Sequence, residues 1–177
     1  MRKISIACLL VLALLLFCSV SYAEEPYQSQ PPAITIEGPD DFKQTIQTMF
    51  DLIKLKDIRL YYWYAENANK IVLGDVDREN TAAMNNIDTT SQIVITIDTD
   101  FYNAVKAKYD KQGALVFVGF IGHECAHTQL RYNSIYTDED VEGICNLAAA
   151  RALQAVGAEN TFHYKIWADG VTSSIKL

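Results

Sequence analysis

The chain has 177 residues, half of them apolar, and its 22 acidic residues outnumber its 15 basic ones to give a formal net charge of −7 at pH 7. This acidic balance argues against a nucleic acid or an anionic membrane as the partner. The length beyond the apolar N-terminal segment is enough for one core and leaves no room for a second domain.

Residues 1–23 have the pattern of a signal peptide. Two basic residues precede an apolar run over residues 4–20, and Ser21 and Ala23 are the small residues that signal peptidase requires. We therefore expect cleavage after Ala23 and export to the periplasm or out of the cell. The apolar run is at the short end for a membrane span, so an uncleaved anchor is the alternative. After cleavage no stable membrane association is expected.

Residues 24–37 include three prolines and predict an extended lead-in, so the folded domain is expected to span residues 38–177. The first helix is predicted from a cap at Asp40 or Asp41 to Lys56, because apolar residues recur there at helical spacing. These apolar residues are Phe42, Ile46, Met49, Phe50 and Ile53.

Strands are expected next along the chain. Residues 58–65 and 71–75 predict two strands, and the aromatic string Tyr61-Tyr62-Trp63-Tyr64 is interpreted as packing on both faces of a sheet. The polar residues 78–90 predict a loop, residues 93–97 a third strand, and residues 101–109 a further helix. This order predicts an α+β fold with a small antiparallel or mixed sheet and with helices segregated after it.

The segment His123-Glu124-Cys125-Ala126-His127 is an HExxH motif. Residues 113–122 before it are apolar on every side, which predicts a helix buried in the core. On a helix, His123 and His127 leave the same face and can share one tetrahedral zinc ion. Glu124 can then take the proton of a zinc-bound water that attacks a carbonyl group. The motif therefore indicates a zinc-dependent hydrolase.

A third protein ligand is needed to hold zinc and leave the fourth position for water. A helix is predicted over residues 138–153, and Glu142 lies one turn inside its start. We expect Glu142 to be the third ligand. The alternatives are Asp138 and Glu139 in the exposed first turn, and His163 further along the chain.

These segments resemble the gluzincin metallopeptidases, and in particular the compact single-domain minigluzincin arrangement. The likeness covers about residues 91–155 and rests on the strand at residues 93–97, the HExxH motif and the string Glu142-x-x-Cys145-Asn146-x-x-Ala149. It implies a zincin-like fold in which the helix with the third zinc ligand follows the active-site helix. It also implies that the strand lies along the cleft edge and binds an extended peptide or protein substrate.

The resemblance also implies the role of each site residue. It assigns one Zn²⁺ per chain to His123, His127 and Glu142, and it makes Glu124 the general base. The family often has an aspartate that orients a zinc histidine where this chain has Asn146. An asparagine oxygen can accept the same imidazole N–H, but without a charge it strengthens the ligand less.

A peptidase of this kind also needs a side chain that stabilises the oxyanion. His163 is the favoured candidate for this second catalytic role, and Tyr164, Tyr132 and Tyr136 are the alternatives. His163 and Tyr164 follow the predicted ligand helix, whereas the other two tyrosines lie between the two site helices.

Two cysteines remain after removal of the signal peptide, Cys125 in the motif and Cys145 one turn beyond Glu142. In an oxidising compartment they could form a disulfide that joins the two ligand-bearing helices. The alternatives are two free buried thiols, or a cysteine that ligates zinc.

The sequence thus predicts an exported zinc metallopeptidase that hydrolyses peptide bonds through a water activated by Glu124. The alternative is a zincin-like domain that acts as a non-catalytic binding, adaptor or inhibitory module, which Asn146 and the small size favour. Zinc-dependent hydrolysis of a non-peptide amide is a third interpretation.

Overall fold

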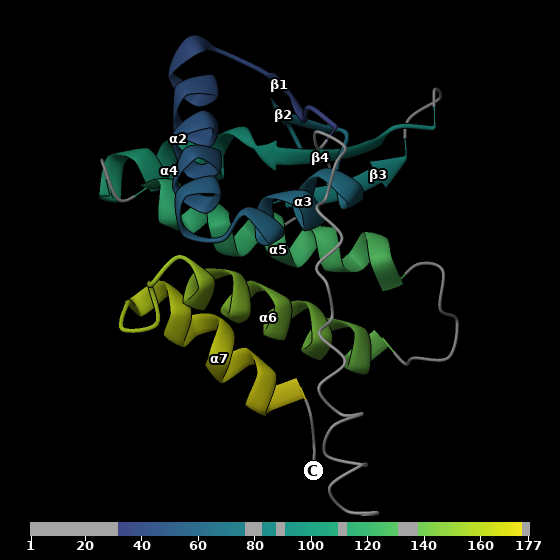
Figure 1. The fold of residues 1–177 in the computed structure, drawn as a ribbon, viewed down its shortest axis with the longest axis vertical. Coiled ribbons are helices and arrows are strands. Elements are labelled where there is room, and N and C mark those ends of the chain that lie inside the picture. The colour runs from purple at the N-terminus through teal and green to yellow at the C-terminus, as the bar shows by residue number, and fades with distance from the viewer. Residues whose placement is uncertain (1–31, 77–82, 88–90, 110–112, 131–137, 175–177) are drawn as a thin grey trace, which may run out of the picture. The chain divides into compact units, whose positions relative to one another are not determined.

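The protein has an α+β fold built from a small mixed sheet and several helices (Figure 1). The computed structural model describes residues 32–76, 83–87, 91–109, 113–130 and 138–174, so the predicted signal peptide lies outside the described residues. Within these ranges the elements are β1 (Thr35–Glu37), α2 (Asp40–Lys56), α3 (Ile58–Asn67), β2 (Lys70–Gly74), β3 (Ala83–Ile87), β4 (Ile93–Asp98), α4 (Thr99–Tyr109), α5 (Gly113–Leu130), α6 (Asp138–Ala155) and α7 (Phe162–Ser174). None of these helices is both long and apolar enough to cross a membrane.

The sheet has the strand order β1-β2-β4-β3. The strands β1, β2 and β4 run parallel, so Ile71 of β2 lies opposite Ile36 on one side and Ile95 on the other. Strand β3 pairs antiparallel with β4 and forms one edge of the sheet. The predicted α+β class and mixed sheet are confirmed. Helices α2 and α3 precede β2, however, so the helices are not segregated after the strands.

Strand β4 is the strand that the sequence analysis places along a cleft edge, and that prediction is wrong because β4 is paired on both sides. Its Ile95 lies opposite Ile71 of β2 and Asn85 of β3. Strand β3 falls within residues 78–90, where the sequence predicts a loop. Its asparagines have a low strand preference, and pairing with β4 supplies the hydrogen bonds that the sequence pattern does not reveal.

Residues 58–65, predicted as a strand, form helix α3 instead. The Asp57 side chain begins this helix by accepting hydrogen bonds from two backbone N–H groups of the first turn. Tyr61 and Tyr64 are buried three residues apart, which is the spacing of one helix face. The aromatic composition favours a strand, but the cap and the burial of one helix face decide the conformation.

Helix α2 ends at Lys56 as predicted and buries the predicted apolar face. Its cap differs from the prediction, because Pro39 occupies the N-cap position and makes no side-chain cap bond. Asp41 instead accepts a 2.9 Å hydrogen bond from Phe42 N and forms an ion pair with Lys106 of α4. The first contact stabilises the start of α2, and the ion pair joins it to α4.

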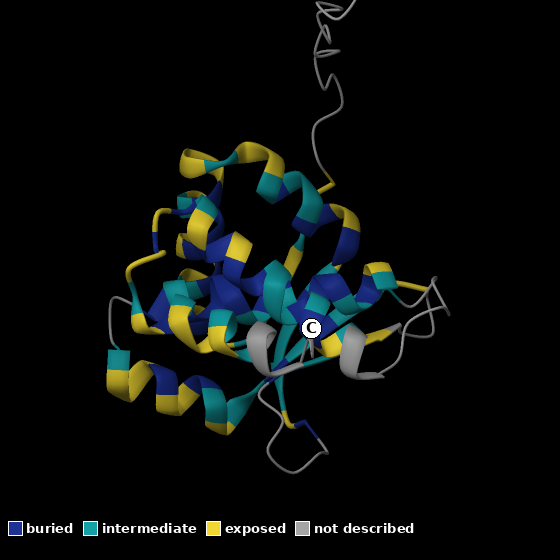
Figure 2. Ribbon diagram, turned by 90° about the horizontal axis from the view of Figure 1, so that it is seen from below, coloured by how far each residue is buried: buried dark blue, intermediate teal, exposed yellow. Residues whose placement is uncertain are grey.

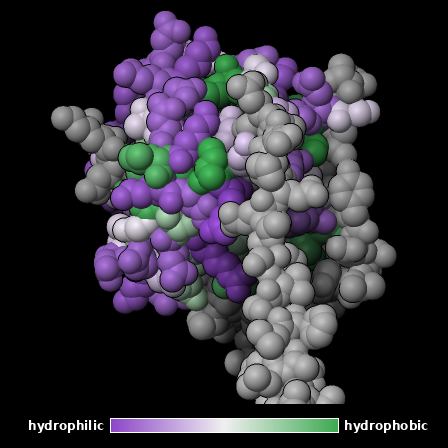
Figure 3. All heavy atoms as spheres, in the orientation of Figure 1, coloured by the Kyte–Doolittle hydropathy of each residue, from purple (hydrophilic) through white to green (hydrophobic). Residues whose placement is uncertain are grey.

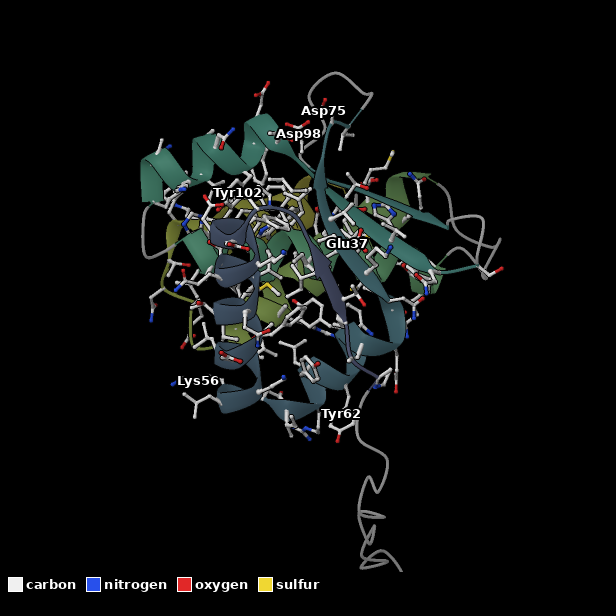
Figure 4. The ribbon with its side chains drawn as sticks, turned by 90° about the horizontal axis from the view of Figure 1, so that it is seen from above. Glu37, Lys56, Tyr62, Asp75, Asp98 and Tyr102 are labelled. Carbon is white, nitrogen blue, oxygen red and sulfur yellow. The ribbon has the colours of Figure 1, made fainter. Side chains whose placement is uncertain are left out.

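Asp98 holds the turn from β4 into α4. One of its carboxylate oxygens accepts a 2.9 Å hydrogen bond from Phe101 N, and the other accepts a 3.2 Å bond from Val76 N. These hydrogen bonds lower the pKa of Asp98. Figure 4 shows Asp98 beside Asp75 at this end of the sheet.

Helix α5 lies at the centre of the packing. Its residues Val116, Phe117, Val118 and Ile121 are at most 4% exposed, which confirms the helix buried on every side. The sheet and helices α2 to α4 lie on one side of α5, and the helices α6 and α7 lie on the other (Figure 1). Buried residues gather in the middle of the fold (Figure 2), while the face in Figure 3 is mostly hydrophilic with isolated hydrophobic residues.

Two glycines of α5 let its neighbours come close. A Cβ at Gly122 would lie 2.9 Å from Tyr64 Oη and 3.3 Å from Ala152 Cβ of α6. A Cβ at Gly119 would clash with the Trp167 indole of α7. In the space at Gly122, the Tyr64 hydroxyl donates a 2.7 Å hydrogen bond to a backbone carbonyl of α5. Helices α3, α6 and α7 therefore all approach α5 at these glycines.

We expect Gly122→Ala to destabilise the protein by about 1–3 kcal/mol, because the new methyl group must displace Tyr64 and α6. Gly113→Ala is the matched control, since its Cβ would meet only Val105 at an ordinary 3.5 Å. Urea unfolding followed by circular dichroism measures both variants. Equal stability of the two would show that the close approach at Gly122 imposes no constraint.

Candidate metal centre

The two histidines of the HExxH motif face each other near the end of α5. Their Nε2 atoms lie 3.0 Å apart, and their ring planes are inclined by 71°. Four residues on a helix make about one turn, so both rings project on the same side, toward α6. Two imidazole nitrogens at this distance can bind one ion between them.

Glu142 of α6 lies opposite this pair, as the sequence analysis expects. Its Oε2 atom is 3.4 Å from His123 Nε2, and its Oε1 atom is 3.4 Å from His127 Nε2. With metal–ligand bonds of 2.0–2.1 Å, the ligand atoms of a tetrahedral zinc ion lie about 3.3 Å apart. The three donors therefore fit a zinc ion with little movement. The Glu142 side chain is 54% exposed, which leaves solvent access at that corner.

Cys145 is a second candidate for the third ligand. Its Sγ atom and the ring nitrogens of His123 and His127 lie within 4.8 Å of one another. Burial, followed by the charges of Glu142 and Glu124, raises the pKa of the Cys145 thiol to about 12. Glu142 is the better candidate for a third ligand, because its oxygens are already at ligand spacing, whereas the Cys145 thiol would first have to lose its proton.

The predicted disulfide between Cys125 and Cys145 is not formed, and both residues are free thiols. The two side chains have different surroundings. Cys125 is fully buried in the hydrophobic core near Tyr64, whereas Cys145 borders the histidine pair. Cys125 follows His123 by two residues, so on a helix it points away from the face that the histidines share.

Glu124, the predicted base, is a buried residue of α5. Burial, and to a smaller extent the negative charge of Glu124, raises the pKa of both the Cys125 and the Cys145 thiol, so the carboxylate lies within electrostatic range of Cys145, which borders the histidine pair. The helix at this point is anchored by Thr128, whose hydroxyl donates to Asn67 O of α3 at 3.1 Å. A carboxylate within hydrogen-bond reach of a metal-bound water can act as its general base.

His123 is supported from behind by α7 and α6. Its ring packs on Trp167 with centroids 5.1 Å apart and an inclination of 35°, and Trp167 packs in turn on Phe120. The Asn146 amide lies close enough to raise the pKa of His123, yet His123 Nδ1 makes no hydrogen bond of normal geometry among the described residues.

The protonation state of His123 suits metal binding. Burial and, to a smaller extent, the neighbouring His127 lower its pKa to about 4, against the opposing effect of Asn146. The imidazole is therefore neutral near neutral pH. A neutral imidazole with a free lone pair is the form that binds a metal ion.

His163, the predicted oxyanion residue and an alternative ligand, lies elsewhere. It is buried, and its ring packs edge-on against Tyr109 with centroids 4.7 Å apart. Burial and the charge of Lys108 lower its pKa. It precedes Trp167 by one helical turn, toward the start of α5, and no described contact joins it to the two motif histidines.

The other sequence candidates are only partly described. Tyr132 and Tyr136 lie outside the described residues, as do the side chains of Asp138 and Glu139. Tyr164 packs against the hydrophobic core. Sequence reasoning missed Trp167, because an aromatic residue on a C-terminal helix carries no local sign that it will contact a histidine of another helix.

Comparisons with protein families, with curated proteins and with solved structures found no match to this chain.

Zinc content should separate the two candidate third ligands. We expect about one zinc ion per chain, and we expect Glu142→Ala to weaken zinc affinity by at least about 100-fold, the upper range for loss of a supporting group. Cys145→Ser should retain zinc, and so should Glu159→Ala, a control at an exposed glutamate beyond α6. Elemental analysis after dialysis measures this. Zinc loss in Cys145→Ser alone would make the thiol the third ligand.

Tryptophan fluorescence should report the ion directly. The chain has two tryptophans, so Trp63→Phe leaves Trp167, which packs on His123, as the only tryptophan, and excitation at its absorption edge avoids the tyrosines. We expect Co²⁺ to quench this variant strongly, because a bound paramagnetic ion would lie close to the indole. Trp167→Phe, with Trp63 beside Gln129 as its emitter, should be quenched much less. Equal quenching of the two variants would argue against binding at the histidine pair.

Proposed function

We propose that the protein is a zinc-dependent peptidase with a zincin-like arrangement of its site. The observation that supports this most is the triangle of His123, His127 and Glu142, with donor atoms 3.0 to 3.4 Å apart. The second supporting feature is a buried carboxylate, Glu124, next to the same cluster. Two imidazoles and one carboxylate are the ligand set of hydrolytic zinc sites that keep one position open.

Each residue has a distinct task in this proposal. His123, His127 and Glu142 would hold the zinc ion, which when bound supplies a Lewis acid that polarises a carbonyl group and activates water. Glu124 accepts the proton of the attacking water and passes it to the leaving amine. Trp167 packs on the His123 ring and limits its motion, so that the ligand is held in place before the ion arrives.

The substrate in this proposal is an extended peptide that adds to the edge of the sheet. Strand β4 is paired on both sides, so it cannot offer main-chain groups to a substrate. Strand β3 is paired on one side only among the described strands, and it packs near α5. Main-chain pairing with such an edge would align a peptide beside the histidines. Export through the N-terminal signal is part of the same proposal.

A non-catalytic binding module is the second candidate function. It is favoured by the position of His163, which leaves no described side chain identified for the oxyanion. It is also favoured by the uncharged Asn146 behind His123. In this case the histidine site would bind an ion for stability or for a partner, and no peptide bond would be cut.

Glu124→Gln separates the two functions. If the protein is a peptidase, this variant should lose at least about 100-fold of its activity on a labelled casein or a quenched-fluorescence peptide library, because the amide cannot take a proton. Its zinc content should remain unchanged. Glu159→Gln serves as the control for loss of a carboxylate elsewhere. Activity that survives in Glu124→Gln would rule out this base, and the absence of activity in the unaltered zinc-loaded protein would favour the binding module.

A further inference from the structure

A groove of about 420 Å³ lies between α3, α5 and α6, away from the histidines. We name it the α3/α5/α6 groove. Its walls are mostly apolar, and their main apolar residues are Leu60, Trp63, Leu130, Ile144 and Leu147. All five are half-buried, so each leaves part of its apolar surface open to the groove. The volume is in the range of small-molecule sites, about 300–1,000 Å³.

The groove is distinct from the candidate metal centre. Helix α6 turns Glu142 and Cys145 toward the histidines, whereas Ile144, Leu147 and Arg151 line the groove. Residues two apart on a helix differ in direction by about 200° around its axis, so they point to nearly opposite sides. The residues that face the histidines and those that line the groove therefore occupy different faces of α6. A ligand in the groove would not touch the histidine pair.

The two ends of the groove differ. Helix α6 runs antiparallel to α5, because Glu142 lies at His127 while Leu153 lies at Gly119. Ile144 is therefore near the Leu130 end of α5, and Arg151 is further back. At the Leu130 end, Trp63 Nε1 donates a hydrogen bond to Gln129 Oε1 at 3.4 Å and closes the wall between α3 and α5. Helix α3 runs in the same direction as α5. Asp57, the N-cap residue of α3, therefore lies toward the Arg151 end of the groove.

The charged residues of the groove lining, Asp57 and Arg151, both lie at this end. Asp57 is engaged by its own helix, because it accepts the backbone N–H groups of Arg59 and Leu60 and pairs with Arg59 Nε at 3.4 Å. Arg151 is exposed and forms no ion pair with any described carboxylate. The groove thus combines an apolar trough with the Arg151 guanidinium, which has no carboxylate partner in the part of the chain that the structure describes.

We propose that the α3/α5/α6 groove binds a small amphiphilic carboxylate of the fatty-acid class. The alkyl chain lies along Leu60, Leu147 and Leu130, where it covers apolar surface that is otherwise open to water. The carboxylate meets Arg151, whose planar fork can donate two parallel hydrogen bonds to its two oxygens. The proposal does not depend on the metal centre, since it uses other faces of α5 and α6.

Calorimetry with decanoate and with decanol, which has the same chain length and no carboxylate, tests the proposal on the full chain. Decanoate, kept below its micellar concentration, should bind about tenfold or more tightly than decanol, because it adds a charge-assisted pair. Arg151→Gln should abolish this difference. Arg59→Gln is the matched control and should preserve it, since Arg59 is already paired with Asp57. The His123→Ala variant should bind decanoate with the affinity of the unaltered protein, whether or not the variant still binds a metal ion.

Ala148→Trp provides a second variant, which fills the middle of the groove and leaves Arg151 in place. It should reduce the binding of both ligands. No decanoate binding by the unaltered protein would overturn the proposal. Equal affinity for decanoate and decanol would do the same, and so would decanoate binding that neither Arg151→Gln nor Ala148→Trp weakens.

Discussion

The burial of α5 is the constraint on which the rest of the structure depends. A helix with no polar face must be covered on every side, and here the sheet and α2 to α4 cover one side while α6 and α7 cover the other. Gly119 and Gly122 make this possible, because they leave room for Trp167 and for Tyr64. The polar residues of the motif then come at the end of an otherwise apolar helix. There α6 brings Glu142 within 3.4 Å of both half-buried imidazoles and so gives them a polar partner.

The features that sequence analysis predicts correctly are those encoded locally. The apolar run before His123, the periodic stripe of α2 and the strand at residues 93–97 each carry a pattern that one segment can show alone. Glu142 also meets the histidines as expected, because two helices joined by a short connection bring their facing turns together. Helix spacing and residue type suffice for these cases.

The errors come from contacts between distant segments. Tyr61 and Tyr64 suit a strand by composition, but Asp57 and the surface of α5 make them one face of a helix. Strand β3 depends on its pairing with β4, which no local pattern reveals. The positions of Cys125 and His163 follow from which neighbour each helix face meets, so neither the absent disulfide nor the pairing of His163 with Tyr109 could be derived from spacing.

The donors of the candidate metal centre come from two helices, so a bound ion would cross-link α5 to α6. An ion held by His127 of α5 and Glu142 of α6 would close a chain loop of about fifteen residues, as a covalent cross-link would. In the chain-entropy description, a cross-link over a loop of that size restricts the unfolded chain by about 3 kcal/mol. The ion would therefore provide the cross-link between these helices that a Cys125–Cys145 disulfide does not form. Resistance of the fold to heat would then follow the availability of the ion in the surrounding compartment.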